Sequence, residues 1–240
     1  MSDRAVVLAG GMGSRLRPYT IVLPKPLMPI GEHSILELIV KQLHGAGFRR
    51  ITMAVNHQAN LIRALFGDGS QWDLEIDYSL ESKPLSTIAP LLLIQDLPDT
   101  FLLMNGDVLT DLDFRDFLTS HEEAESAFTI SASRRRQIID YGVLHVSSEG
   151  YLEGFEEKPR TDYLVSMGVY AVSRDVLRHV PPDTRFGFDD LMWALLRSRE
   201  RVTVREHPGY WLDIGRPDDY HQAIEEFEAD PGRFLGRQSA

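Results

Sequence analysis

The feature that most constrains the fold is an uninterrupted apolar run at residues 5–9, AVVLA, that leads directly into a glycine-rich turn. A continuous apolar run of this length is typical of a strand buried on both faces of a parallel sheet. Residues 51–55, 74–78 and 101–105 predict further strands, with helical segments between them. This alternation predicts an α/β fold with a doubly wound, mostly parallel, Rossmann-like central sheet.

The segments between these strands carry helical signals. Ser34 and Glu37 have the spacing of a capping box, and the apolar residues that follow lie on one helical face until Gly45 or Gly47 ends the helix. Residues 60–66 and 91–97 are also expected to be helical.

The second half of the chain predicts a more mixed sheet. Residues 127–132, 142–146 and 151–157 alternate as antiparallel strands do, and residues 189–197 and 218–228 predict helices. No linker, composition break or internal repeat separates the halves. We therefore expect a single domain over residues 1–240, with halves of about 1–110 and 111–240.

Charge and composition exclude several functions. The 36 Asp and Glu residues against 25 Lys and Arg residues give a net charge of −11, which disfavours binding to nucleic acid or to an anionic membrane. The longest apolar run, residues 88–94, contains Pro90 and is too short for a membrane helix. The absence of cysteine and of a signal peptide predicts a cytoplasmic protein.

The glycine-rich turn predicts an anion site. Gly10, Gly11 and Gly13 follow the first strand, and such a turn exposes backbone N–H groups that a phosphate can approach without meeting a Cβ atom. Arg15 adds a guanidinium suited to phosphate oxygens. The alternative is an ordinary glycine turn.

Two familiar phosphate loops do not fit this segment. The dinucleotide fingerprint requires a third glycine where Leu16 stands, so a nicotinamide-dependent oxidoreductase is a weak alternative. The P-loop requires a Gly-Lys-Ser/Thr triplet, which the chain lacks.

Lys25 lies between Pro24 and Pro26, which predicts an extended segment that aims the lysine at one point. A lysine of this kind can also be an ordinary surface residue. Its importance therefore depends on what lies beside it.

Two aspartates predict a metal site. Asp107 follows the strand at residues 101–105, so parallel strands would bring it to the same sheet edge as the glycine turn. Asp213 lies in an apolar segment that ends at Gly215. Two carboxylates beside a phosphate loop suit Mg²⁺, although Asp107 alone could be a turn residue. Asp111 and Asp113 are interpreted as caps of a helix that starts near Phe114.

Taken in order, these segments resemble the sugar-1-phosphate nucleotidylyltransferase family. The resemblance spans residues 5 to about 225 and is closest to the short guanylyltransferases that act on mannose- or heptose-type 1-phosphates. It is carried by five motifs, GGMGSRLRP at 10–18, PKP at 24–26, GD at 106–107, EKP at 157–159 and WLDIG at 211–215.

The resemblance implies transfer of a nucleotidyl group from a nucleoside triphosphate, with GTP favoured, to a sugar 1-phosphate, with release of pyrophosphate. It implies four groups of residues. The nucleotide-binding residues would be Leu8, Gly10, Gly11, Gly13, Ser86 and Thr87. The catalytic residues would be Arg15, Lys25, Asp107 and Lys158. The sugar would meet Gly142, Glu157 and Lys158, and Asp107 and Asp213 would share Mg²⁺.

One loop departs from the family pattern. Where relatives commonly have Pro-Leu-Gly-Thr-Ala-Gly, residues 84–89 read PLSTIA, so Ser86 and Ala89 add Cβ atoms where glycine usually meets the base and sugar. This leaves two alternatives: a catalytically weakened homologue that binds nucleotides for regulation, or a thymidylyl-, cytidylyl- or uridylyltransferase. The sequence leaves open the sugar, the pathway and whether the chain forms a homo-oligomer.

Overall fold

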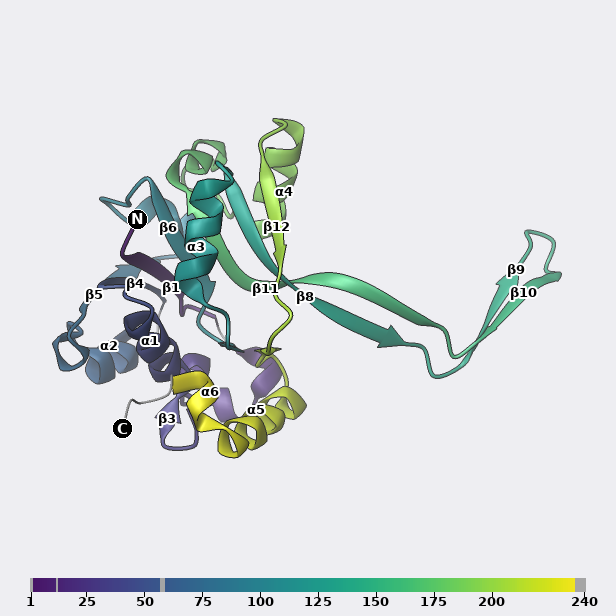
Figure 1. The fold of residues 1–240 in the computed structure, drawn as a ribbon, viewed down its shortest axis with the longest axis horizontal. Helices are drawn as coiled ribbons and strands as arrows, with labels where there is room; N and C mark the ends of the chain where they lie inside the picture. The colour runs from purple at the N-terminus through teal and green to yellow at the C-terminus, as the bar shows by residue number, and fades with distance from the viewer. Residues whose placement is uncertain (1, 12, 57–58, 236–240) are drawn as a thin grey trace.

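The computed structural model describes residues 2–11, 13–56 and 59–235. Its centre is a seven-stranded sheet with the strand order β12-β8-β11-β6-β1-β4-β5 (Figure 1). Four neighbouring strands are parallel: β1 (Arg4–Leu8), β4 (Arg50–Val55), β5 (Glu75–Leu80) and β6 (Thr100–Asn105). The predicted α/β fold with a mostly parallel central sheet is confirmed.

Two apolar layers cover the sheet because successive side chains of a strand point to opposite faces. Ala5 and Val7 of β1 join one buried cluster, and Val6 joins the other. Both clusters draw residues from before and after position 110. The division into halves at that position stays a prediction.

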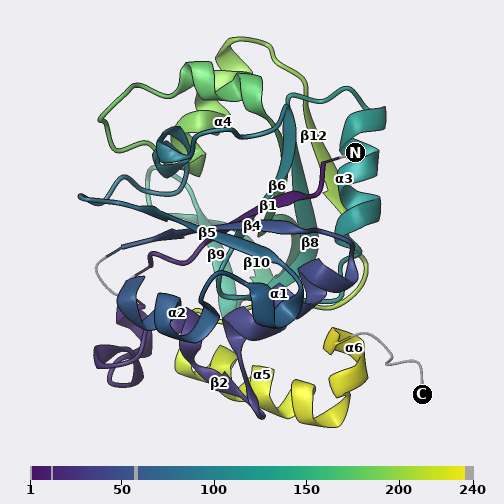
Figure 2. The same cartoon turned by 90° about the vertical axis from the view of Figure 1, so that its left-hand side faces the viewer.

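Helices lie on both sides of the sheet (Figure 2). The first cluster packs under α1 (Ile35–Gly45), α2 (Ala59–Phe66), α3 (Phe114–Glu123), α5 (Pro217–Ala229) and α6 (Pro231–Leu235). The second packs under α4 (Phe188–Arg197). No helix among the described residues is long and apolar enough to cross a membrane.

The sheet continues through strands of mixed direction. β11 (Arg160–Ser173) is antiparallel to both β6 and β8 (Phe128–Ile138), and β12 (Val202–Glu206) is parallel to β8. Two small sheets belong to the body of the protein, β7 (Val108–Thr110) with β13 (Trp211–Asp213) and β2 (Pro29–Ile30) with β3 (His33–Ser34). β7 and β13 matter for function because they connect the two predicted metal ligands.

The ends of β8 and β11 leave the body of the protein as a long two-stranded ribbon (Figure 1). At its tip the chain forms a hairpin of β9 (Gly142–Val146) and β10 (Leu152–Glu157). We call residues 133–166 the arm. The antiparallel strands expected at residues 142–146 and 151–157 are present, and nothing in their sequence pattern indicates that they leave the core.

Three local predictions are wrong. Residues 91–97 do not form an α-helix, because the chain makes a 3₁₀ turn at Ala89–Leu93, is extended at Ile94 and has a left-handed φ of 59° at Asp96. Lys25 is not extended but begins a 3₁₀ turn, in which Leu27 N donates to the Pro24 carbonyl at 2.8 Å. Asp113 caps α3 as expected, whereas Asp111 binds His207, Tyr210 and Arg233 instead.

Candidate active site

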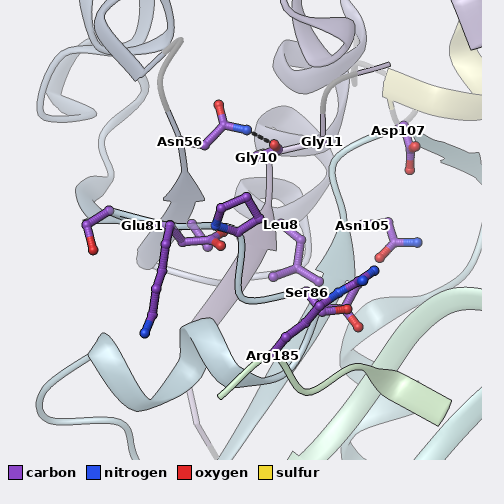
Figure 3. A pocket seen from close by; sticks show the side chains of 14 residues that line it. Leu8, Gly10, Gly11, Asn56, Glu81, Ser86, Asn105, Asp107 and Arg185 are labelled. Carbon is purple, nitrogen blue, oxygen red and sulfur yellow. Dashed lines mark hydrogen bonds between the residues drawn. The ribbon is translucent and has the colours of Figure 1, made fainter. Parts of the chain in front are cut away.

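A cavity of about 600 Å³ opens at the carboxyl ends of the four parallel strands (Figure 3). Ligands of open α/β sheets bind at this edge. The lining residues follow β1, β4, β5 and β6 in turn, with one later segment: Leu8, Gly10, Gly11, Ala54, Asn56, Glu81, Ser82, Lys83, Pro84, Ser86, Thr87, Asn105, Asp107 and Arg185. Its volume is in the range of small-molecule sites.

Gly10 and Gly11 of the glycine turn line one side of this cavity, and Gly13 does not line it. Asn56, which follows β4, donates a side-chain hydrogen bond to the Gly10 carbonyl (Figure 3). Gly13 has φ of 57°, and a Cβ atom there would come within 2.9 Å of Thr20 Cγ2 and 3.0 Å of Lys25 Cβ. Glycine is therefore required at position 13 by space as well as by backbone conformation. Met12, between Gly11 and Gly13, lies outside the described residues.

Lys25 and Asp107 meet at the sheet edge. Lys25 is buried, with 6% of its surface exposed, and its ammonium group donates to Asp107 Oδ2. Asp107 is placed by the tight turn after β6, where a Cβ atom on Gly106 would lie 2.9 Å from the Leu8 carbonyl. A buried lysine paired in this way is not an ordinary surface residue.

Asp213 lies beside Asp107 because β13 pairs with β7. The ladder places Asp213 opposite Val108, and Ile214 N donates to the Asp107 carbonyl at 3.1 Å. Burial and then the nearby Asp107 carboxylate raise the pKa of Asp213, while Lys25 and Arg15 oppose that rise. The Arg15 guanidinium and the Asp213 carboxylate both lie beside Gly215. A Cβ atom on Gly215 would be 3.1 Å from Asp213 Oδ2 and 3.3 Å from Arg15 Nη2.

The two carboxylates fit a divalent cation that takes its other ligands from substrate and water. Asp107 Oδ1 is buried and has no hydrogen-bond partner among the described residues. The described residues contain no cluster of three or more acidic, histidine or cysteine side chains, so no closed all-protein metal cage is present in them. Mg²⁺ commonly binds through one or two carboxylates together with phosphate oxygens.

The loop that departs from the family pattern is only partly in the cavity. Ser86 and Thr87 line it, and Ser86 has a left-handed φ of 75°. Thr87 also has a structural role, since its hydroxyl accepts from Phe188 N at 2.9 Å at the start of α4. Ala89 is buried in the 3₁₀ turn and is not among the lining residues, so the expectation that its Cβ narrows the cavity is wrong.

Several lining residues were not identified from the sequence. Asn56, Glu81 and Asn105 each stand at or directly after the end of a parallel strand. Their position at the carboxyl ends of parallel strands, the same position as that of the glycine turn and Asp107, is the signal in the sequence that marks them. Burial raises the pKa of Glu81, although a hydrogen bond from Leu85 N opposes the rise. Arg185 reaches the cavity from a loop before α4 that no local pattern marks (Figure 3).

The residues predicted to bind the sugar lie away from the cavity. Gly142, Glu157 and Lys158 lie on the arm, and none of them lines the cavity. The Lys158 side chain is 58% exposed and lies 3.8 Å from Asp140, which is exposed as well. The structure thus brings together the predicted phosphate and metal residues and separates them from the predicted sugar residues.

Comparison with known proteins agrees with this geometry. The family model "Nucleotidyl transferase" matches residues 4–230. The chain therefore belongs to the nucleotidyl transferase family.

Individual relatives differ in their nucleotide. A mannose-1-phosphate guanyltransferase of Schizosaccharomyces pombe is 30% identical over 227 residues, covering 90% of this chain and 62% of the relative. A UTP–glucose-1-phosphate uridylyltransferase of Synechocystis is 31% identical, covering 92% of this chain and 62% of the relative. The chain thus spans less than two thirds of the length of these two relatives. The solved structure of HddC from Yersinia pseudotuberculosis with GMP-PN has a TM-score of 0.72 and 25% identity, and the match covers 93% of this chain and 99% of HddC.

Proposed function

We propose that the protein is a Mg²⁺-dependent sugar-1-phosphate nucleotidylyltransferase whose reaction takes place beside Asp107. One observation carries this proposal. The buried Lys25 donates to Asp107, the other carboxylate oxygen of Asp107 is buried without a partner among the described residues, and Asp107 lines the same cavity as Gly10 and Gly11. In a member of the nucleotidyl transferase family, this arrangement suits a triphosphate and a metal ion.

In this proposal, the side chains and backbone N–H groups at the site neutralise the charge on the phosphates and hold them in position. In the proposed reaction a sugar-phosphate oxygen attacks the α-phosphorus, a new O–P bond forms, and the bond from the α-phosphorus to the pyrophosphate oxygen breaks. The attacking phosphate is already ionised at neutral pH, its second pKa being about 6, so no general base is required. The difficulty is repulsion between two anions and the charge that develops on pyrophosphate.

The residues at the site would reduce the repulsion between the two phosphates and the charge that develops on pyrophosphate. The N–H groups of Gly10, Gly11 and Gly13 would hold the triphosphate, with Leu8 beside them. Arg15 and Lys25 would neutralise charge on the α-phosphate and on the departing pyrophosphate. Holding the reacting atoms in line lowers the barrier without any covalent step by the protein.

Asp107 and Asp213 would hold the metal ion. When bound, Mg²⁺ supplies positive charge to phosphate oxygens and a fixed geometry for them. Burial and then repulsion from Asp107 raise the pKa of Asp213, and a bound cation would relieve that repulsion.

We favour GTP as the nucleotide. A mannose-1-phosphate guanyltransferase is among the relatives, and HddC was crystallised with GMP-PN. Uridylyl, thymidylyl and cytidylyl transfer remain alternatives within the proposal, because a uridylyltransferase is equally similar. We propose Gly142, Glu157 and Lys158 as the residues that bind the sugar 1-phosphate. We also propose that the reaction takes place in the cytoplasm, because the chain has no cysteine.

The test is a panel of four triphosphates against several hexose and heptose 1-phosphates, read out as pyrophosphate release with and without Mg²⁺. We expect release that requires both substrates and the metal and is fastest with GTP. Release with no pair would contradict the proposal.

The second candidate is a homologue that binds nucleotides without turnover. Ser86, in a left-handed conformation where relatives have glycine, is the observation that favours it. Tight GTP or nucleotide-sugar binding by calorimetry, with no pyrophosphate release from any pair, would establish this alternative instead.

A further inference from the structure

The arm has no hydrophobic core of its own. Residues 133–166 are all described, and none of them is buried. A two-stranded ribbon without a covering layer is at best marginally stable in water. Some other surface must therefore cover at least part of the arm.

One face of the hairpin at the tip is apolar. The β9–β10 ladder places Leu144 opposite Phe155 and Val146 opposite Leu152. These four side chains are between 54% (Val146) and 63% (Leu152) exposed. The opposite face is more polar, with Val143 opposite Glu156 and an ion pair of 2.9 Å between His145 and Glu156. A one-sided apolar surface of this kind is typical of an interaction surface.

The same face carries residues that the proposed function assigns to the sugar. Gly142 stands opposite Glu157 at the next pair of that face, because side chains two residues apart point the same way. Lys158 follows directly at the bend where the hairpin meets the β8–β11 ribbon (Figure 1). Whatever surface covers the apolar face therefore lies next to these residues.

The base of the arm is fixed in its direction away from the body. Arg134 donates two hydrogen bonds to the Glu206 carboxylate, at 2.9 and 2.8 Å, and the Arg135 guanidinium lies 4.9 Å from the centre of the Trp211 ring. The β8–β11 pairing is regular from Arg160 opposite Ile138 to Ser166 opposite Ala132. Turning the base of the arm toward its own cavity would break these contacts, whereas a neighbouring molecule can meet the arm as it stands.

We propose that two copies of this chain exchange arms, so that each active site combines the body of one copy with the arm of the other. This inference rests on the proposed function. Asp107, Lys25 and the glycine turn of one copy would bind the triphosphate, and Lys158 and Glu157 of the partner subunit would bring the sugar 1-phosphate.

Two features favour a second copy over another partner. Among the described residues that line the cavity, Arg185 is the sole one beyond Asp107, so the cavity side lacks the residues that the arm carries. Exchange is also reciprocal: the same two surfaces pair twice around a two-fold axis and leave no arm uncovered.

Complementation between two impaired variants tests the exchange, with turnover measured at a sugar 1-phosphate concentration well below the wild-type KM. Asp107→Asn disables the body, and under this condition Lys158→Ala, which raises the KM for sugar 1-phosphate, disables the arm. The two would be co-expressed with different tags and purified for both. In such a heterodimer one of the two sites has an intact body and an intact arm, so we expect about half of the wild-type turnover per dimer. Failure to recover a doubly tagged complex, or no activity above that of the parent variants, would overturn the proposal.

Crosslinking tests the same arrangement without activity. Because the chain has no cysteine, Ser82→Cys at the cavity and Lys158→Cys on the arm introduce the sole thiols. We expect a short bismaleimide to join one variant to the other as a covalent heterodimer. If the double variant in dilute solution forms an intrachain crosslink instead, the arm serves its own cavity and the proposal is wrong. A heterodimer from a protein that shows no turnover with any substrate pair would leave the exchange standing and remove the proposed function.

Two adjacent residues of β9 provide a matched pair of variants. Leu144→Asp places a charge on the apolar face, and Val143→Asp places the same charge on the opposite face. We expect sedimentation velocity to show twice the chain mass of 27.2 kDa for the wild type and Val143→Asp, and a monomer for Leu144→Asp. Melting temperature serves as the folding control, because neither residue is buried. A wild-type monomer, or equal behaviour of the two variants, would overturn the proposal.

Discussion

Lys25 donates to one oxygen of Asp107 and leaves the other oxygen buried without a partner among the described residues. This relationship fixes one oxygen of the carboxylate and leaves the other for the metal ion that we propose. It brings together a lysine between two prolines and an aspartate 82 positions further along the chain.

The first prediction concerns Asp107. Asp107→Asn keeps the volume of the side chain and removes its charge, so the fold should persist while turnover falls by about 100-fold or more. Pyrophosphate release measures this loss. Asp113→Asn is the control: Asp113 caps α3 and does not line the cavity, and asparagine caps a helix about as well as aspartate, so stability and turnover should both stay nearly unchanged. Near wild-type rates for Asp107→Asn would remove Asp107 from the reaction.

The second prediction separates the two lysines. Lys25→Met retains much of the buried side-chain volume and removes the ammonium group, so kcat should fall and triphosphate binding should weaken. Lys158→Ala should mainly raise the KM for sugar 1-phosphate, since Lys158 lies on the arm and does not line the cavity. Initial rates with each substrate varied in turn measure both effects. The same effect of both variants on both substrates would contradict their separate roles.

The third prediction concerns base selection. Ser86 lines the cavity with φ of 75°, which glycine adopts without strain, so Ser86→Gly should fold at least as well as the wild type. Because it removes a hydroxyl and a Cβ atom from the cavity, we expect broader acceptance of the four triphosphates. Ala89→Gly is the matched control, as Ala89 lies outside the lining. Unchanged selectivity in Ser86→Gly would show that this residue does not select the base.

The fourth prediction is a loss of stability in acid. Burial lowers the pKa of His121 from 6.5 to about 4, and its ring nitrogens bond to Thr129 at 2.8 Å and Ser173 at 3.2 Å. The unfolded chain therefore takes up this proton near pH 6.5 and the folded chain does not, so stability falls as the pH drops from about 6.5 toward 4. Between pH 7 and pH 5 this amounts to about 2 kcal/mol.

Urea unfolding at the two pH values measures that difference. In His121→Gln the group that titrates is absent, so the difference should shrink by about the same amount. If the variant keeps the full pH dependence of the wild type, other groups cause it.

Much of the body could be predicted from the sequence because its signals are local. The strands at 51–55 and 101–105 and the cap at Ser34 follow from the apolar runs and from the spacing to Glu37, whose N–H donates to Ser34 Oγ at 3.1 Å. Asp107 could be placed at the sheet edge because a parallel sheet collects the carboxyl ends of its strands.

What the sequence could not show depends on distant pairing. Arg185 reaches the cavity from the loop before α4, and Asp111 binds His207 and Arg233 instead of capping a helix. No local sequence pattern marks the role of Arg185 or that of Asp111. The strands that form the arm have ordinary strand patterns. Whether such strands stay in the core or leave it depends on how far β8 and β11 continue beyond their neighbours, which no short window of sequence records.

The central claim is that a sugar-phosphate oxygen attacks the α-phosphorus of a nucleoside triphosphate beside Asp107. The most direct test uses a sugar 1-phosphate whose three non-bridging phosphate oxygens are ¹⁸O, with mass spectrometry of both products. The account predicts that all three ¹⁸O atoms appear in the nucleotide sugar and none in pyrophosphate, and that Asp107→Asn forms little of either product. Label in pyrophosphate, or no nucleotide sugar from any of the tested pairs, would contradict it.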